Sequence, residues 1–268
     1  MPVISVCSPK GGVGKTTLAS NLAYTFARAG TKVITIDFDP QNALRLYFGI
    51  PLSEDRGFID KVATDSDWTT AALNVGKNLF TLPFGRSTVM QRRQLENLLM
   101  QPHYLKQRQS GLFCNPDILV IADFPPGYSV ALQAVAEVSD VNVIPLLADA
   151  ASIALFSQIT NNELLEGPLN TNKGYFIVLN EVDNRVKLNR EIQDFAVTNF
   201  PDRLIGTIHT DTSVVEAAAL QQAISDFNPN SSASFDIEII ARKLATVLGF
   251  EVKQDTMVLN PIKGGQQI

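Results

Sequence analysis

The stretch that decides the fold is SVCSPKGGVGKTTLASNLA, residues 5–23. It matches the phosphate-binding loop G-x-x-x-x-G-K-[ST] at every fixed position except the first, where Pro9 stands in place of glycine. A second lysine, Lys10, follows this proline directly. The loop joins an apolar, β-branched run (3–8) to a segment with helical periodicity (14–29). This strand–loop–helix setting is the context in which such a match predicts phosphate binding.

The chemistry of the loop points to a nucleoside triphosphate. Its glycines let backbone N–H groups turn inward around phosphate oxygens, and the start of the following helix adds unpaired donors. Lys15 would reach the β- and γ-phosphates, and the Thr16 hydroxyl would ligate Mg²⁺. The predicted nucleotide-contacting residues of the loop are Lys10, Gly11, Gly12, Val13, Gly14, Lys15, Thr16 and Thr17.

Short apolar runs alternate with helical segments almost to the end of the chain, which predicts a doubly wound, mostly parallel α/β sheet in a single domain. The predicted strands are 3–8, 32–37, 79–84, 117–123, 141–147, 174–180 and 203–208. A linker-like stretch (225–234) precedes an amphipathic helix (235–248). We expect the domain to cover residues 1–250 and the tail, 251–268, to be loose.

Composition narrows the classes of function. The 268 residues carry 22 Lys and Arg against 27 Asp and Glu, and the net charge of −5 gives no global attraction for nucleic acid or anionic lipid. Two cysteines, Cys7 and Cys114, are too few for a disulfide framework. The longest apolar stretch (141–156) is interrupted by polar residues and falls short of a spanning helix, and no leader precedes the first strand. We expect a cytoplasmic protein.

The segment KGGVGKT (10–16) resembles the deviant Walker A loop of the ParA/MinD family of ATPases, which carry an extra signature lysine before the glycines. Lys10 occupies that place in the P-loop. In the family this lysine reaches across a sandwich dimer to the nucleotide of the other subunit. The resemblance therefore implies a P-loop NTPase that binds ATP and Mg²⁺ at the interface of an ATP-dependent homodimer.

Two further segments come in the order that the family uses. TIDFDPQNAL (35–44) is similar to the first switch, and the resemblance implies that Asp37 holds the Mg²⁺ region through water while Asp39 orients the attacking water. The alternative interpretation is that Asp39 simply begins the next helix. ILVIADFPPG (118–127) looks like the Walker B strand and second switch, which makes Asp123 a Mg²⁺ residue through its water shell.

Two later segments concern recognition of the nucleotide base. Within VLNEVD (178–183) the resemblance makes Asn180 the residue that contacts the base. IHTDTSVVEAAA (208–219) resembles a second base-contacting segment, although His209 stands where proline is usual. Asn180 and Asp183 also match the N-K-x-D spacing that reads guanine, with Glu181 in place of the lysine. Because that lysine is missing and the family uses ATP, the sequence favours adenine.

Within the family, the segments 42–51, 56–73 and 79–85 look like those of the members encoded with bacterial cellulose synthase. That likeness implies a slow, regulatory ATPase that supports a membrane-bound cellulose-secretion complex through protein partners. Direct lipid anchoring is not expected, because the last residues are interrupted by Pro261 and by acidic and amide side chains. Bridging cysteines of the nitrogenase iron-protein kind are missing as well.

Two alternatives remain open at the level of sequence. One is a partition ATPase that binds nonspecific DNA, for which the best basic cluster is Arg86, Arg92, Arg93, Lys106 and Arg108. The same cluster would also suit an acidic partner or a solvated helix face. The other alternative is a small-molecule phosphotransferase or ligase of the dethiobiotin synthetase type, which would need a pocket for a chemical acceptor.

Overall fold

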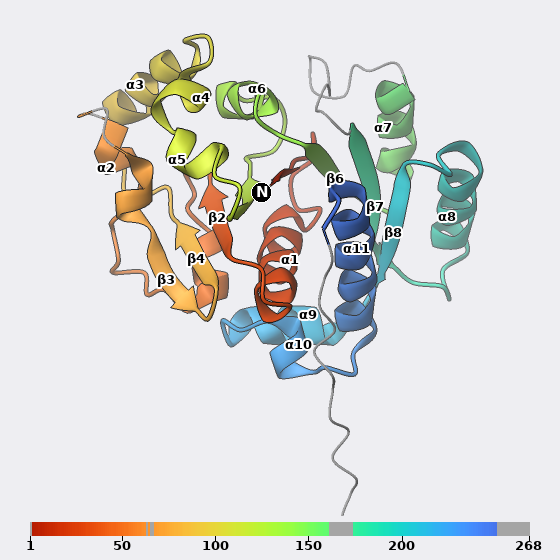
Figure 1. The fold of residues 1–268 in the computed structure, drawn as a ribbon. Helices are drawn as coiled ribbons and strands as arrows, with labels where there is room; N and C mark the ends of the chain where they lie inside the picture. The colour runs from red at the N-terminus through yellow and green to blue at the C-terminus, as the bar shows by residue number, and fades with distance from the viewer. Residues whose placement is uncertain (1, 63, 65–66, 161–173, 251–268) are drawn as a thin grey trace, which may run out of the picture.

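The computed structural model describes residues 2–62, 64, 67–160 and 174–250 (Figure 1). Helices and short 3-10 helices alternate with strands along the whole described chain. In chain order the elements are β1 Val3–Val6, α1 Lys15–Arg28, β2 Val33–Asp37, the 3-10 helix η1 Leu44–Phe48, α2 Ile59–Val62, the 3-10 helix η2 Trp68–Ala71, β3 Leu73–Gly76, β4 Leu79–Leu82, α3 Val89–Leu99, α4 Tyr104–Arg108, α5 Ser110–Phe113, β5 Leu119–Asp123, α6 Val130–Ala136, β6 Val141–Leu147, α7 Ala150–Thr160, β7 Tyr175–Val182, α8 Lys187–Asn199, β8 Leu204–His209, α9 Thr212–Ala219, α10 Ile224–Phe227 and α11 Ser232–Leu248.

The strands form one sheet in the order β3-β4-β2-β5-β1-β6-β7-β8. Every neighbouring pair is parallel except β3 with β4. The predicted doubly wound, mostly parallel sheet is therefore confirmed, and its central strand β1 feeds the glycine loop. At such a crossover point, ligands bind beyond the carboxyl ends of the strands. The edge strand β3 was not predicted, because its four residues are half-exposed and end in a glycine.

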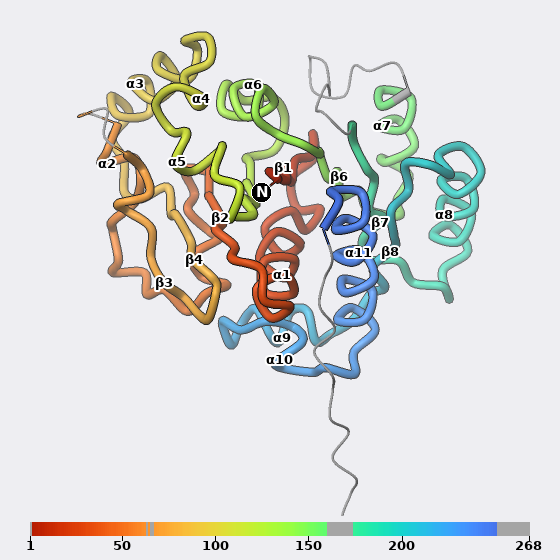
Figure 2. Tube along the Cα trace, in the orientation of Figure 1, coloured from red at the N-terminus to blue at the C-terminus, as the bar shows by residue number. Residues whose placement is uncertain are grey.

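Two hydrophobic clusters cover the two faces of the sheet. One cluster joins the sheet to α1, α9, α10 and α11, and the other joins it to α2 through α8. In α1 the apolar residues Leu18, Leu22 and Phe26 fall four apart and are buried together. The trace shows α1 and α11 side by side, with α9 and α10 beneath them (Figure 2). The sheet thus lies between two helical layers, as the apolar strands require.

The stretch 225–234 is not a linker. Residues 224–227 form α10, and α11 begins at Ser232 because the side chain of Ser231 accepts a hydrogen bond from the backbone of Ser234. Arg28 in α1 also pairs with Asp226 at 2.7 Å, which ties this segment to the domain. The predicted loose tail, 251–268, lies outside the described residues. In the described part of the chain, no helix combines the length and apolar character needed to cross a membrane.

Candidate nucleotide site

The glycine loop runs from β1 to α1 and is shaped for a ligand. Gly12 and Gly14 both have positive φ, 73° and 88°. At Gly14 the positive φ favours glycine, and a Cβ there would also lie 2.4 Å from the side-chain nitrogen of Asn180, which would have to move. Within the described chain, no side chain caps the N-terminus of α1 by a hydrogen bond. The first N–H groups of this helix are therefore available to an anion.

Lys15 is the first residue of α1, and its side chain is buried in the loop. Its Nζ donates to the backbone oxygen of Lys10 at 3.2 Å, which brings the ammonium group back over the loop. Burial lowers the pKa of Lys15, and the nearby carboxylates Asp123 and Asp39 oppose this shift. The geometry thus holds a cation where bound phosphates would meet it.

Asp123 ends β5 and faces the start of α1. Its Oδ2 accepts a hydrogen bond from the Thr16 hydroxyl at 2.6 Å, while its Oδ1 is buried without a hydrogen-bond partner among the described residues. Burial raises the pKa of Asp123 to about 7, against the lowering effects of Thr16 and Lys15. A buried carboxylate with an unused oxygen is short of positive charge, and a bound cation would supply it.

Asp37 ends β2 and lies opposite Asp123 in the parallel register. Its two carboxylate oxygens accept backbone N–H groups of Asp39 at 2.9 Å and Leu44 at 3.1 Å. Burial, followed by the nearby Asp123 charge, raises the pKa of Asp37 well above its usual range. Asp37 therefore holds the turn between residues 37 and 44 in place, and it puts a second carboxyl group beside Asp123.

Asp37, Asp123 and Thr16 fit Mg²⁺ better than they fit a metal ion whose ligands all come from the protein. The described residues contain no group of three or more His, Cys, Asp or Glu that could hold an ion. Two carboxylates and the Thr16 hydroxyl meet at the strand ends, beside the phosphate loop. Mg²⁺ commonly takes one or two protein carboxylates and completes its shell with water and substrate phosphates. The donor set matches that preference.

Asp39 lies in the turn that follows β2. Its Oδ1 accepts the backbone N–H of Gln41, and its backbone oxygen accepts that of Asn42. The next helical segment, η1, begins only at Leu44, and its N-cap is Ala43. Asp39 is therefore not a helix-starting residue, and that alternative interpretation of the sequence is not supported. Thr17, also predicted in the loop, hydrogen-bonds through its hydroxyl to Tyr47 at 2.8 Å.

The signature lysine has an intramolecular partner that the sequence did not predict. Lys10 Nζ lies 2.5 Å from Asp149 Oδ2, and both side chains are about one-third exposed. The other oxygen of Asp149 accepts the backbone N–H and hydroxyl of Ser152 at the start of α7. Burial raises the pKa of Asp149, but the hydrogen bonds from Lys10 and Ser152 lower it by more. The pKa of Asp149 is therefore below its usual value. The available signal was the D-x-x-S spacing of a helix cap after a buried strand.

A cleft of about 230 Å³ opens beside the loop. Asn180 stands at its border and donates from Nδ2 to the backbone oxygen of Val13 at 3.0 Å. The cleft is lined by both apolar and polar residues, the usual make-up of a small-molecule site. Its lining residues are Gly14, Thr17, Leu18, Asn180, Glu181, Ile208, His209, Thr210, Asp211, Val214, Val215, Ile224 and Ile237.

The sequence left the roles of Asp183, His209 and Asp211 in base recognition undecided, and each of them has a hydrogen-bond partner within the protein. The carboxylate of Asp183 accepts the guanidinium of Arg185 at 2.8 Å and does not line the cleft. His209 lines the cleft, but its Nδ1 lies 2.8 Å from Asp236 of α11. Asp211 caps α9 through the backbone N–H of Ser213. The segment that follows β8 therefore helps to form the cleft despite the departure at His209.

The five basic residues considered for DNA are spread over the α3–α4 region. Arg86 precedes α3 and pairs with Asp55 at 3.3 Å. The remaining four lie on two helices, with Arg92 and Arg93 in α3 and with Lys106 and Arg108 in α4. Asp55 offsets part of the charge at one end of this group. The arrangement alone does not identify a nucleic-acid surface.

Comparison with known proteins places the chain in a family. The family model described as "Cellulose biosynthesis protein BcsQ" matches residues 1–244. The chain is 27% identical over 260 residues to a virulence plasmid ParA family protein, pGP5-D, of Chlamydia trachomatis, covering 95% of this chain and 98% of that protein. It is 23% identical over 250 residues to the cellulose biosynthesis protein BcsQ of Escherichia coli K12, covering 90% and 93%.

Among solved structures, the septum site-determining protein MinD of Pyrococcus horikoshii, complexed with Mg-ADP, superimposes with a TM-score of 0.71 at 20% identity. The match covers 95% of this chain and 99% of that one. It confirms the MinD/ParA type of P-loop fold predicted from the glycine loop and the strand order. The match of the family model over nearly the whole chain shows more: this protein belongs to the BcsQ family of ParA/MinD-like proteins.

Proposed function

We propose that this protein is an ATP-dependent dimerisation switch with slow ATPase activity. The observation that carries the proposal is the pair of lysines at one phosphate loop. Lys15 is buried and turned over the loop, whereas Lys10 is partly exposed and held at its rim by Asp149. The first lysine is suited to phosphates bound in its own subunit. The second is suited to leave Asp149 for the phosphates of a second copy.

Each residue around the phosphates has a role that follows from its position. The N–H groups of residues 11–16 would surround the β- and γ-phosphates, with Lys15 adding charge. Thr16 and Asp123 would hold Mg²⁺, with Asp37 beside them. When bound, Mg²⁺ would supply positive charge to the phosphate oxygens. Asp39, next to this group on the 37–44 turn, would orient the attacking water.

The cleft beside the loop supports ATP rather than GTP. In the N-K-x-D pattern that reads guanine, the carboxylate would come from Asp183, and Asp183 is engaged by Arg185 outside the cleft. The Oδ1 atom of Asn180 is available to accept from an adenine amine, since its Nδ2 already donates to Val13. In addition, the MinD relative was solved with Mg-ADP.

The biological role that we propose is regulation of assembly or localisation of a membrane-bound cellulose synthesis and secretion complex. The BcsQ family model and the relatives of that name at 23% identity support this role. The ATP-bound dimer would present a surface to protein partners of the complex, and hydrolysis would reset it. Such a protein would act in the cytoplasm and reach the inner membrane through these partners.

Three measurements on the purified protein test this function. Calorimetric titration with Mg-ATP and Mg-GTP should show binding of ATP and at least tenfold weaker binding of GTP. Release of ADP and phosphate should occur without any added metabolite, which separates a switch from a phosphotransferase or ligase. Light scattering after gel filtration should give a dimer with ATP and a monomer with ADP. Lack of ATP binding would overturn the proposal.

A second candidate function is a partition ATPase, favoured by the 27% identity with a plasmid ParA family protein. It would require the α3–α4 region or another basic surface to bind DNA. Binding to nonspecific duplex DNA that needs ATP and weakens steeply between 50 and 200 mM salt would favour it. Equal, negligible binding with ATP and ADP at low salt would leave the cellulose role as the better account.

A further inference from the structure

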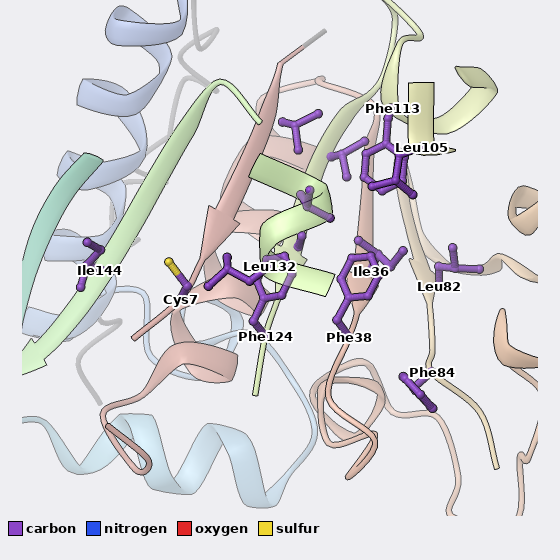
Figure 3. Packing of buried hydrophobic residues seen from close by; sticks show 14 of the residues in the cluster. Cys7, Ile36, Phe38, Leu82, Phe84, Leu105, Phe113, Phe124, Leu132 and Ile144 are labelled. Carbon is purple, nitrogen blue, oxygen red and sulfur yellow. The ribbon is translucent and has the colours of Figure 1, made fainter. Parts of the chain in front are cut away.

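Two phenylalanines join the ends of β2 and β5 on the face of the sheet away from α1. Phe38 follows Asp37 at the end of β2, and Phe124 follows Asp123 at the end of β5. Their rings stack with centroids 5.1 Å apart and planes 6° apart. The backbone N–H of Phe38 also donates to the backbone oxygen of Asp123 at 2.8 Å. Figure 3 shows both rings at the ends of these strands.

The alternation of side chains along a strand explains this arrangement. Asp37 and Asp123 turn to the face that holds α1, so the residues after them turn to the opposite face. Both rings are almost completely buried there, with 3% of Phe38 and 1% of Phe124 exposed. Phe38 is bonded directly to Asp37 and Asp39, and Phe124 is bonded directly to Asp123. A movement of the backbone at either ring therefore also moves the neighbouring carboxyl groups.

The stack in turn packs against Phe58 and Trp68. Phe38 contacts Phe58 at 5.5 Å and Trp68 at 6.3 Å between ring centroids. Phe58 and Trp68 lie 4.7 Å apart. Trp68 is fully buried, its backbone N–H donates to Gln109 at 3.0 Å, and its indole Nε1 has no hydrogen-bond partner in the described structure. A buried, unpaired indole N–H carries a desolvation cost, so a displacement that gave it a partner would be favoured.

From these contacts we infer that Phe38 and Phe124 are positioning residues for Asp39 and Asp123, and that they transmit nucleotide-dependent shifts of both segments to Trp68. The inference rests on the proposed function, because it takes Asp39 and Asp123 to act at bound ATP. It adds a role for residues that lie outside the phosphate loop in the sequence. The ring stack fixes the spacing of the two segments, and the aromatic cluster around Trp68 resists any change in it.

The first arm of the test needs no substitution. Trp68 is the single tryptophan of the chain, so the intrinsic emission reports on this site alone. We expect Mg²⁺ with a slowly hydrolysed ATP analogue to change the intensity or wavelength of that emission, with a midpoint equal to the calorimetric Kd. Emission that stays constant while the analogue binds would overturn the inference.

The second arm compares three substitutions of similar size. Phe38→Met and Phe124→Met keep volume and apolar character but remove the stacked planes. Phe26→Met is the matched control, because Phe26 is fully buried in the other core cluster and touches neither carboxylate segment. We expect Phe38→Met and Phe124→Met to lower kcat about tenfold, since small misplacements of catalytic groups are costly. Their Kd for ATP should stay within about twofold of the wild-type value, because the phosphate loop that binds ATP is unchanged.

The controls separate this inference from the proposed function. All three variants should lose similar thermal stability, but only Phe26→Met should keep both the wild-type kcat and the Trp68 response. If wild type binds and hydrolyses ATP while Phe38→Met behaves like Phe26→Met, the positioning role is wrong and the proposed function stands. If wild type does not bind ATP, the proposed function fails and the inference falls with it.

Discussion

The two faces of strands β2 and β5 differ in the chemistry that they carry. One face presents Asp37 and Asp123 to the phosphate loop, with raised pKa values and one unused carboxylate oxygen. The other presents Phe38 and Phe124 to a dry aromatic cluster. The charged face costs stability through burial, and the aromatic face offsets this through packing. Adjacent residues on two strands thus place buried carboxyl groups on one face and a packed aromatic support on the other.

The largest effect on the charged face is expected from Lys15→Ala. It removes a buried ammonium from the phosphate site, and charge-assisted contacts of this kind contribute several kcal/mol. We expect ATP binding to weaken about 100-fold or more, measured by calorimetry. The control is Lys32→Ala, which removes a lysine that lies over the ring of Phe80 instead. Retained ATP affinity in Lys15→Ala would contradict the role of the loop.

Asp39→Ala should leave ATP binding intact and lower turnover about 100-fold, as expected for loss of a group that positions the attacking water. Phosphate release measures turnover, and gel filtration with light scattering should show the ATP-bound dimer accumulating. Normal hydrolysis by this variant would remove Asp39 from its assigned role and shift attention to Asp37 and Asp123.

Lys10→Ala tests the exposed lysine, with Asp149→Asn as its counterpart. The first should bind ATP with a Kd within about threefold of wild type but remain monomeric, because the charge offered to the second subunit is gone. The second removes the negative partner of Lys10 and should dimerise at lower ATP concentration. Sedimentation velocity distinguishes them. Identical profiles for both variants and wild type would contradict the proposal that Lys10 leaves Asp149 for the nucleotide of a second subunit.

The smallest effect is a pH dependence of the nucleotide-free protein. Burial raises the pKa of Asp123 from 3.8 to about 7, so the folded state binds more protons than the unfolded state between these values. The contribution of Asp123 to stability should therefore fall as pH rises from about 4 to 7, and level off above it. We expect Tm to be about 3–6 °C lower at pH 8 than at pH 5. Asp123→Asn should reduce this difference, and an unchanged slope would contradict the assignment.

The sequence predicted most of the fold because apolar runs and the glycine loop are local signals. It missed β3, whose four half-exposed residues give too short a pattern. It also misread residues 225–234 as a linker, since Asn, Pro and Ser are common both in loops and at helix starts. Ser231 in fact caps α11. Local composition could not tell these two uses apart.

The sequence predicted that some residues of the candidate site lie together, and the remaining contacts depend on the tertiary structure. The loop and the carboxylates Asp37 and Asp123 meet as their order along the chain implied. Asp149 lies 139 residues from Lys10 in the chain, and no local pattern joins the two. The rings of Phe38 and Phe124 lie within the recognised segments, but only the folded sheet brings them together. Partners across strands are visible only once the strand order is known.

The central claim is that the state of the nucleotide controls pairing of two copies. Its most direct test is the sedimentation velocity of the wild-type chain at one concentration, with Mg²⁺ and either a non-hydrolysable ATP analogue or ADP. The account predicts twice the monomer mass with the analogue and the monomer mass with ADP. The same mass in both nucleotides, with each shown to be bound, would contradict it.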